Sequence, residues 1–370
     1  MTIYVTRAGD SVAGVARGFG VEPAHLAQLN QLSDPSRLTA GLALLIPSSE
    51  PLLRRCAAEL NICAACAVRQ GALSQLLPKA TYLCSFSAQA QPEGAVSVED
   101  DGPLLQAAYA HRALPLLTVS NYSAALGGFS AETAHRLLSE EGAQSAFFDS
   151  LLKRMEERPY GGAAFDLQYI YPFEREAYSR LLCRAAHTLH PRGAYLFAFA
   201  PPKTEDDEYS LISGGCDYAA LGQYCDRVIL HFSERSGGQP PAVSRTGDIL
   251  DYAAGRIPAG KILPDISLRG GCGVFGGEAR SISPAAAAEL AVSVGAEVKY
   301  EPLSQTARFT YKDALGRPCR VWFEDIRSTL EKLRLAQLIS PAGLSIWCAA
   351  LTHRPTAQLI TAIPDTEKIL

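Results

Sequence analysis

The residues best placed to do chemistry in this 370-residue chain are an acid and an amide two positions apart, Asp166 and Gln168. They lie in the apolar, β-prone stretch Tyr160–Ile170, which breaks at Pro172 before a charged helical segment. This pattern predicts a buried parallel strand that leads into a helix. Residues two apart on a strand share a face, so in a (β/α)8 barrel both side chains would point into the cleft at the carboxyl ends of the strands.

The segment that contains this pair resembles the strand-4 signature of glycoside hydrolase family 18, Asp-x-x-Asp-x-Asp-x-Glu. In this alignment Asp166 matches the last Asp, and Gln168 stands where the family has its proton-donating Glu. Family members use the 2-acetamido oxygen of the sugar as nucleophile while the Glu protonates the leaving oxygen. A carboxamide has no proton to give near neutral pH, and loss of a general acid costs roughly 100- to 10,000-fold in rate. The resemblance therefore implies a glycosidase fold with a degenerate acid position.

The resemblance continues in the right order along the chain. Residues 226–234 are similar to the family's strand 6, which normally carries Met-x-Tyr-Asp, with Phe232 at the Tyr and Ser233 at the Asp. Three further segments are similar to Ile-Pro-Leu-Tyr-Gly, to Val-Trp-Phe-Glu-Asp-Ala-Arg-Ser and to the strand-8 Ser-Tyr-Trp: Ile266–Gly270, Val321–Ser328 and Leu344–Trp347. These matches imply the family fold, but they also imply that the acetamido clamp of strand 6 is lost.

The expected site has four substrate-binding candidates besides Asp166: Asn121, Tyr169, Phe232 and Trp347. Trp347 ends the last strand, where the family implies a floor that stacks on a pyranose ring, although a Trp that only packs fits the sequence equally well. Phe232 is expected in the core or in the cleft wall. Glu234 follows strand 6 directly and is the candidate for a displaced acid, which must reach the glycosidic oxygen from another strand.

The first fifty residues predict a separate module. Ile3–Val5 alternates as a strand, a helical repeat of apolar residues ends at Gly20, Pro23 begins a second helix, and Leu44–Pro47 reads as a closing strand. This β-α-α-β order resembles a LysM module. LysM modules bind N-acetylglucosamine in chitin or peptidoglycan through two loops, which by position contain Gly9, Asp10, Ser11 and Val12, and Leu32, Ser33, Asp34 and Pro35. A LysM fold kept only for packing or protein contacts is the alternative.

The whole chain is therefore predicted to be α/β. A LysM module at 1–48 and a linker at 49–54 precede a (β/α)8 TIM barrel at 55–370, with a small α+β insertion at about 293–323 between strands 7 and 8. The eight barrel strands are expected at Leu60–Val68, Thr81–Ala88, Leu114–Asn121, Gly162–Ile170, Ala194–Ala200, Arg227–Phe232, Lys261–Leu268 and Leu344–Cys348. A single LysM copy predicts modest glycan affinity without avidity.

Composition excludes several classes of function. The net charge of −4 with scattered basic residues gives no support for a nucleic-acid partner, and no apolar stretch reaches the length of a membrane span. No signal peptide is expected, because Met1 is followed almost at once by the first strand. The ten cysteines are expected to be thiols, and Cys63 and Cys66 face opposite sides of strand 1, so no metal or cofactor is predicted.

Three functions remain open from the sequence. The first is a spore-envelope protein that binds peptidoglycan or chitin-like glycan with little or no hydrolysis, and the second is an active N-acetylglucosaminidase with a displaced acid. The third is a coat assembly protein that binds other proteins, favoured if Arg269 or His231 fills the cleft. By resemblance the location is the mother-cell cytoplasm and then the spore coat or cortex, where the cysteines could cross-link.

Overall fold

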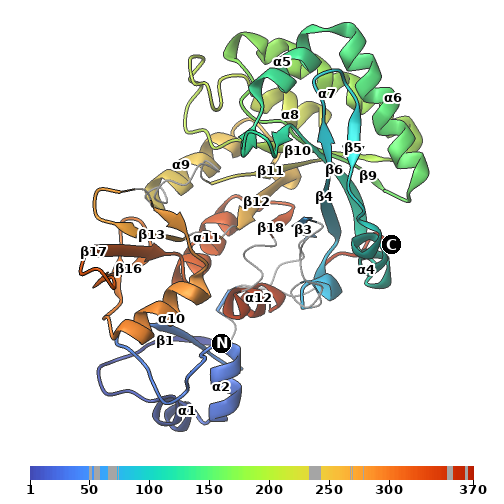
Figure 1. Cartoon of the computed structure of the whole chain (residues 1–370). Coiled ribbons are helices and arrows are strands. Elements are labelled where there is room, and N and C mark those ends of the chain that lie inside the picture. The colour runs from blue at the N-terminus through green and yellow to red at the C-terminus, as the bar shows by residue number, and fades with distance from the viewer. Residues whose placement is uncertain are drawn as a thin grey trace.

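The computed structural model describes residues 1–49, 52–53, 59–65, 73, 75–232, 243–266, 268, 270–277, 279–347, 353–362 and 366–370. Within these residues the chain forms a small amino-terminal module, a barrel of parallel strands wrapped by helices, and a separate antiparallel sheet (Figure 1). The predicted fold class is confirmed.

The amino-terminal module is a two-stranded sheet with two short helices. β1 (Thr2–Val5) pairs antiparallel with β2 (Ala43–Ile46), and α1 (Val12–Phe19) and α2 (Pro23–Leu29) lie between them in the chain. The Ser11 hydroxyl caps α1 by accepting a hydrogen bond from the backbone N–H of Gly14 at 3.1 Å. Apolar residues at helical and strand spacing fill the core: Val12, Val15, Ala16, Leu26, Ala27, Leu44 and Ile46.

The barrel closes through eight parallel strands within the described residues. They are β3 (Glu59–Ala65), β4 (Tyr82–Ala90), β6 (Leu114–Ser120), β9 (Gly162–Asp166), β10 (Tyr195–Ala200), β11 (Arg227–Leu230), β12 (Ile262–Ile266) and β18 (Gly343–Trp347). Neighbours along the chain pair with one another, and β18 closes the barrel by pairing with both β12 and β3. All eight predicted strands are present; β6, β9 and β11 end earlier than expected, at Ser120, Asp166 and Leu230, and β4 ends later, at Ala90.

Helices cover the outside of the barrel (Figure 1). They are α4 (Gly102–Ala110), α5 (Ala131–Ser139), α6 (Glu141–Glu157), α7 (Arg175–Leu189), α8 (Tyr218–Tyr224), α9 (Val243–Ala254), α11 (Ile326–Leu338) and α12 (Arg354–Thr361). Single 3-10 turns lie at η1 (Leu77–Lys79), η2 (Pro172–Glu174), η3 (His190–Arg192) and η4 (Ala259–Lys261), and three short strands add to the loops: β5 (Val96–Val98), β7 (Tyr122–Ser123) and β8 (Gly128–Phe129).

Alternating strand residues divide the barrel core into two layers. The outer layer, between strands and helices, contains residues such as Ala163, Phe165 and Leu230. The inner layer fills the barrel with Cys63, Tyr82, Cys84, Leu114, Leu116, Ala164, Phe197, Phe199, Ile229 and Leu263. Because residues two apart share a layer, the inner layer defines which side chains reach the carboxyl ends of the strands on the inside.

The insertion after β12 is larger than the sequence suggested. Its sheet has the order β14-β13-β17-β16-β15, with the strands β13 (Gly270–Val274), β14 (Arg280–Ser281), β15 (Lys299–Glu301), β16 (Thr306–Lys312) and β17 (Pro318–Phe323) and the helix α10 (Pro284–Val294). β15, β16 and β17 lie within the predicted bounds of about 293–323, but the sheet begins at Gly270. Glycines are poor strand formers and hide β13 in the sequence. Gly271 is needed there, because a Cβ would lie 2.6 Å from the Trp322 indole nitrogen.

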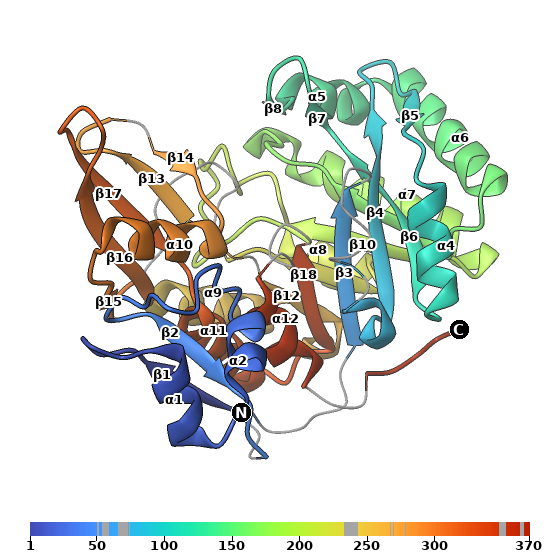
Figure 2. The same cartoon turned by 60° about the horizontal axis from the view of Figure 1, so that its bottom comes forward.

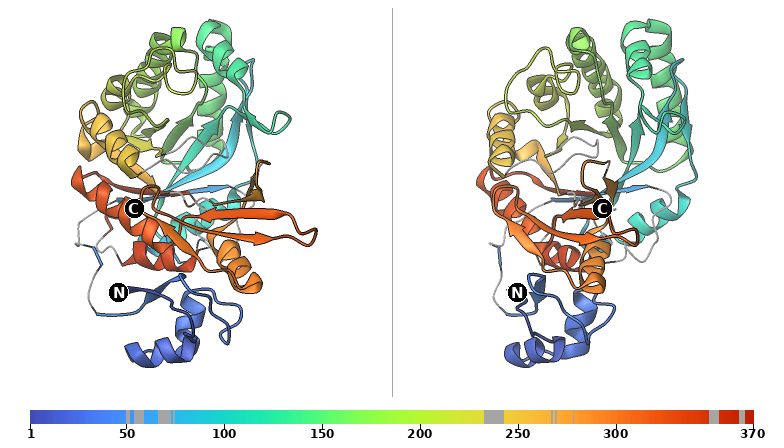
Figure 3. Two further views of the ribbon diagram at one scale, coloured as in Figure 1. Left: turned by 90° about the vertical axis from the view of Figure 1, so that its left-hand side faces the viewer. Right: turned by 60° about the vertical axis from the view of Figure 1, so that its left-hand side comes forward.

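The amino-terminal module packs directly on the insertion and the barrel (Figures 2 and 3). The Thr39 hydroxyl donates to the Ala296 carbonyl at 2.7 Å, and the Val298 N–H donates to the Ala40 carbonyl at 2.9 Å. Gly41 has φ +87°, and a Cβ there would lie 1.7 Å from the Val298 carbonyl oxygen. Leu45 is buried in the same core as the outer barrel residues. The module is therefore held in one orientation by contacts that the sequence did not reveal.

Candidate functional site

Asp166 and Gln168 lie together at the carboxyl end of β9. Asp166 is the last residue of the strand and is fully buried, whereas Gln168 is half-buried. The Gln168 amide Nε2 donates a hydrogen bond to Asp166 Oδ1 at 2.6 Å. Their placement on one side is as predicted from strand spacing. The amide can orient the carboxylate, but it has no proton to transfer to a leaving group.

Asn121 braces the backbone of this pair from the neighbouring strand. It follows β6 and is buried, and its Oδ1 accepts from the Gln168 N–H at 2.9 Å. Its Nδ2 donates to the Gln168 carbonyl at 2.9 Å and to the Ser130 carbonyl at 2.8 Å. All three hydrogen bonds join the Asn121 side-chain amide to main-chain atoms, so both of its N–H donors are already engaged. The structure thus gives Asn121 a positioning role, and the expectation that it binds substrate gains no support.

Tyr169 follows in a backbone conformation that side chains rarely adopt, with φ +56°. The strand β9 has already ended at Asp166, so Tyr169 lies in the loop that follows it. The Tyr169 ring lies next to Phe129, with ring centroids 6.1 Å apart. The Phe129 ring in turn lies 5.7 Å from the half-exposed ring of Tyr122. Tyr169 therefore belongs to an aromatic group on the loops that follow β6 and β9.

An aromatic floor crosses the inside of the barrel. Trp347 ends β18 and contacts Phe86 edge to face at 4.3 Å between ring centroids. Phe86 contacts Phe199 at 5.3 Å, and Phe199 stacks on the His231 imidazole at 5.5 Å with an interplanar angle of 23°. Trp347 is half-buried at the end of the strand, where the sequence predicted it. Its partner rings Phe86 and Phe199 were not anticipated.

A buried acid–imidazole pair lies beside this floor. The His231 Nδ1 is 3.1 Å from Asp265 Oδ2, and both side chains are buried. Within the described residues neither His231 Nε2 nor Asp265 Oδ1 has a hydrogen-bond partner. Strand spacing could have found this pair, because His231 and Asp265 follow the inner residues Ile229 and Leu263 at a distance of two.

Phe232 follows β11 and lies on the opposite side of the chain from His231. It is 3% exposed and packs in the outer core between strands and helices, whereas its neighbour His231 contacts the inner ring of Phe199. The sequence matched Phe232 to the family's Tyr and left it in the core or in the cleft wall, and the structure places it in the outer core. Three other predicted residues, Ser233, Glu234 and Arg269, lie outside the described part of the chain.

Comparison with known proteins identifies both parts of the chain. The LysM domain model matches residues 4–47. The cortical fragment-lytic enzyme of Bacillus subtilis (strain 168) is 30% identical over 293 residues, which cover 76% of this chain and 68% of that enzyme. The chain belongs to the cortical fragment-lytic enzyme family. In this chain a LysM domain precedes the family 18 barrel that the sequence motifs indicated.

Solved structures agree with this family. The spore cortex-lytic enzyme SleL of Bacillus megaterium QM B1551 superposes with a TM-score of 0.90 at 23% identity, covering 100% of this chain and 99% of that one. A chitinase of Chromobacterium violaceum ATCC 12472 superposes with a TM-score of 0.72 at 23% identity, covering 82% of this chain and 99% of that one. At these identities the two structures show a shared fold.

The two LysM loops of this family member lie on the surface of the module. Five of the eight predicted glycan-binding residues are exposed: Gly9, Ser11, Ser33, Asp34 and Pro35. Asp10 and Leu32 are half-buried, and Val12 is buried in the module core, so its side chain is not available to a ligand. The loops face solvent because the module docks on the barrel through α2, β2 and residues 39–42 instead.

Hydrogen bonds fix the shape of these loops. The Asp10 carboxylate accepts from the Arg7 N–H and from the Tyr4 hydroxyl, both at 2.7 Å, and these bonds hold the pKa of Asp10 below its ordinary value. The Asp34 carboxylate accepts from the hydroxyl and N–H of Ser36, which lowers its pKa in the same way. Both acids are thus ionised at neutral pH and shape the backbone that a glycan would meet.

The described residues hold no cluster of three or more histidine, cysteine or acidic side chains that would fit a metal ion. None of the helices described in the structure is both long and apolar enough to cross a membrane. Cys63 is buried on the inner face of β3, and burial raises the pKa of its thiol well above the ordinary value, so it is a poor nucleophile. Its predicted companion Cys66 lies outside the described residues.

Proposed function

We propose that this chain binds N-acetylglucosamine-containing glycan of the spore envelope and hydrolyses it very weakly or not at all. One observation carries the second half of this proposal: the Gln168 amide occupies the acid position and donates to buried Asp166 at 2.6 Å. Replacement of a general acid by a group without a transferable proton costs roughly 100- to 10,000-fold in rate. The names of the relatives, a cortical fragment-lytic enzyme and a spore cortex-lytic enzyme, support glycan of the spore cortex as the ligand.

Two surfaces support binding. The LysM loops are exposed and keep their shape through hydrogen bonds of Asp10, Ser11 and Asp34. In the barrel, Trp347 lies half-buried at the end of the last strand, where an indole face can stack on a pyranose ring. An apolar ring and a set of shaped loops bind sugar without any proton transfer, so affinity can persist after catalysis is lost.

A slow N-acetylglucosaminidase is the second candidate. The lytic relatives favour it, since the chain retains Asp166 on the same strand. Its acid would come from elsewhere, and Glu234 remains the candidate from the sequence. The third function, coat assembly through protein contacts, is supported by the inward position of the buried His231 side chain, and failure of glycan binding would support it further.

The test is mass-spectrometric detection of cleaved glycan after long incubation of the purified chain with cortical peptidoglycan fragments. The matched variants are Gln168→Glu, which returns a carboxyl group to the acid position, and Gln168→Glu combined with Asp166→Asn. We expect no product from the unchanged chain. Product from Gln168→Glu alone would show that a substrate cleft persists without its acid. Product from the unchanged chain would overturn the loss of catalysis, and Glu234→Gln would then test the displaced acid.

Binding is measured separately, by isothermal titration of the chain with N-acetylglucosamine tetramer and with purified cortical fragments. Saturable binding of either supports the proposal. Absence of binding to both would contradict it and leave the protein-binding role.

A further inference from the structure

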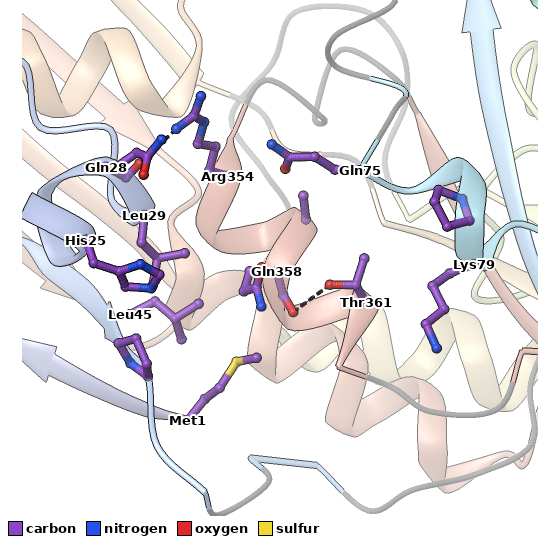
Figure 4. Close-up of a pocket in the computed structure, with 13 residues that line it drawn as sticks. Met1, His25, Gln28, Leu29, Leu45, Gln75, Lys79, Arg354, Gln358 and Thr361 are labelled. Carbon is purple, nitrogen blue, oxygen red and sulfur yellow. Dashed lines mark hydrogen bonds between the residues drawn. The ribbon is translucent and has the colours of Figure 1, made fainter. Parts of the chain in front are cut away.

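A cavity of about 470 Å³ lies between the LysM module and the barrel. Figure 4 shows its walls: α2 and β2 of the module on one side, and α12 and η1 of the barrel on the other. Pockets of this size at the interface of two units are typical binding sites for small molecules. Because residues from both units line it, the cavity exists only while the module is docked.

Among the described lining residues, the cationic side chains are Lys79 on η1 and Arg354 on α12, and the imidazole of His25 on α2 lines the same cavity. No acidic residue is among these described residues. The Arg354 guanidinium donates to the Gln28 carbonyl at 3.3 Å, which holds it at the rim (Figure 4). Neither His25 nor Lys79 forms an ion pair within the described part of the chain. The described lining residues thus include basic but no acidic side chains, although the whole chain has a net charge of −4. Such a lining favours an anionic ligand.

The positive charge extends beyond the cavity wall. The Lys368 ammonium lies next to η1 and donates to the carbonyls of Leu77 and Ala80. Burial lowers the pKa of Lys368, and the positive charges of Arg112 and Lys79 lower it further. Lys79 and Lys368 therefore repel each other, and a carboxylate beside Lys79 would relieve this repulsion.

The uncharged lining suits a peptide rather than a bare sugar acid. Gln75 and Gln358 present amides that can exchange hydrogen bonds with peptide groups, and Gln358 is exposed. Partly exposed apolar residues of the lining, Met1, Leu29 and Pro47, can contact short aliphatic side chains. The lining thus combines cations for carboxylates, amides for the main chain and apolar surface for methyl groups.

We propose that this cavity binds a short acidic peptide, the carboxylate-bearing stem peptide of peptidoglycan. This inference rests on the proposed function, which brings peptidoglycan to the chain, but it concerns a different surface and a different part of the polymer. Glycan held by the LysM loops and peptide held by the cavity would engage two chemically distinct parts of one ligand. Simultaneous engagement raises the effective concentration of each part for its site.

The experiment is isothermal titration of the full chain with a synthetic stem tripeptide that carries no sugar. The same tripeptide with its carboxylates amidated is the matched ligand. We expect the acidic peptide to bind about tenfold more tightly, since one charge-assisted hydrogen bond is worth roughly that factor. Lys79→Glu should abolish this preference and Lys79→Gln should reduce it, while Lys153→Glu on the exposed surface of α6 should change nothing.

Equal affinity for the acidic and amidated peptides, or an unchanged preference in Lys79→Glu, would overturn the inference. A tripeptide of α-linked glutamates separates the two possible sources, since tighter binding of that peptide would point to an acidic protein segment and would also overturn a stem peptide.

Binding of N-acetylglucosamine tetramer is measured in parallel, so that failure of the inference and failure of the proposed function can be distinguished. Tetramer binding without peptide binding would defeat only the inference about this cavity, whereas peptide binding without tetramer binding would support the cavity and remove the support that the tetramer gives to the glycan function.

Discussion

The LysM module and the barrel present their glycan-facing residues in opposite ways. In the module, Ser11 and Asp34 hydrogen-bond to nearby backbone and leave exposed loops of fixed shape. In the barrel, Asp166, Gln168 and Asn121 turn their polar groups on one another and on the main chain. A loop site depends on backbone shape, which many sequences provide, whereas a catalytic site depends on single functional groups. The chemistry of the barrel can therefore be lost while both folds and the module surface persist.

The largest effect is expected where the two regions meet. In Gly41→Ala, the new Cβ would lie 1.7 Å from the Val298 carbonyl oxygen, and the residue must also hold φ +87°. We expect the module to leave the barrel, with a loss of more than about 3 kcal/mol in the free energy of unfolding. Urea unfolding and small-angle scattering would measure both changes.

Gly9→Ala is the matched control for this prediction. Gly9 has the same φ of +87°, but no atom lies within 4 Å of the position that a Cβ would occupy there. In Gly9→Ala the free energy of unfolding should fall only by the backbone penalty of about 1 kcal/mol, and the module should stay docked. Equal losses in the two variants would show that the interface does not depend on close approach at Gly41.

The next largest effect is expected in the barrel alone. Asn121→Ala removes the three hydrogen bonds that hold Gln168 and Ser130, and leaves buried main-chain groups without partners. We expect a loss of about 2–3 kcal/mol in the free energy of unfolding. Asn121→Asp keeps the acceptor for the Gln168 N–H and loses both donated bonds, so it should separate the two contributions. An unchanged free energy of unfolding in Asn121→Ala would mean that the backbone at Gln168 is held by other contacts.

Acid should weaken the barrel side of the interface before the module. Burial lowers the pKa of His353, at the start of α12, to about 4. Its unfolded form takes up a proton below about pH 6.5, whereas the folded form stays neutral down to about pH 4. Stability is therefore complete above pH 6.5 and falls as the pH drops toward 4, by at most about 1.4 kcal/mol per pH unit. Urea midpoints of the unchanged chain should fall more steeply with acid than those of His353→Gln; parallel curves would contradict this.

The smallest effect is expected in the module loops. Ser11→Ala removes the cap of α1 and should cost about 1 kcal/mol in the stability of the module. Affinity for N-acetylglucosamine tetramer should change little, because the Ser11 hydroxyl already accepts a hydrogen bond from the Gly14 N–H. Ser33→Ala, at an exposed position on the other loop, should change neither quantity. A large loss of affinity in either variant would show that LysM binding depends on hydroxyl groups and would weaken the contrast with the barrel.

Much of the fold could be predicted because parallel barrel strands are continuous apolar runs, as in Leu114–Ser120. The strand β13 was missed because Gly270–Val274 has little strand propensity, and it is held by pairing with β17. The docking of the module was also missed. Its contacts join residues 257 positions apart, such as Thr39 and Ala296, and no local pattern encodes them.

Strand spacing predicted part of the candidate site. Spacing of two placed Asp166 and Gln168 together, and their hydrogen bond agrees with this placement. The same rule applied to the strand that contains Ile229 would have put His231 inside and Phe232 outside, as the structure does. The match of residue types left Phe232 in the core or in the cleft wall, because it does not say which side of the strand a residue faces.

The closure of the barrel by β18 fixes an order of events during synthesis. β3 is among the first barrel segments to leave the ribosome, yet its neighbour β18 is made some 280 residues later, as the register Leu60↔Leu344 shows. The LysM module is made before the barrel and can fold at once, whereas its partner residues Val298 and Arg354 follow much later in the chain. The nascent chain therefore carries a folded LysM module on an open sheet until β18 pairs with β3 and closes the barrel.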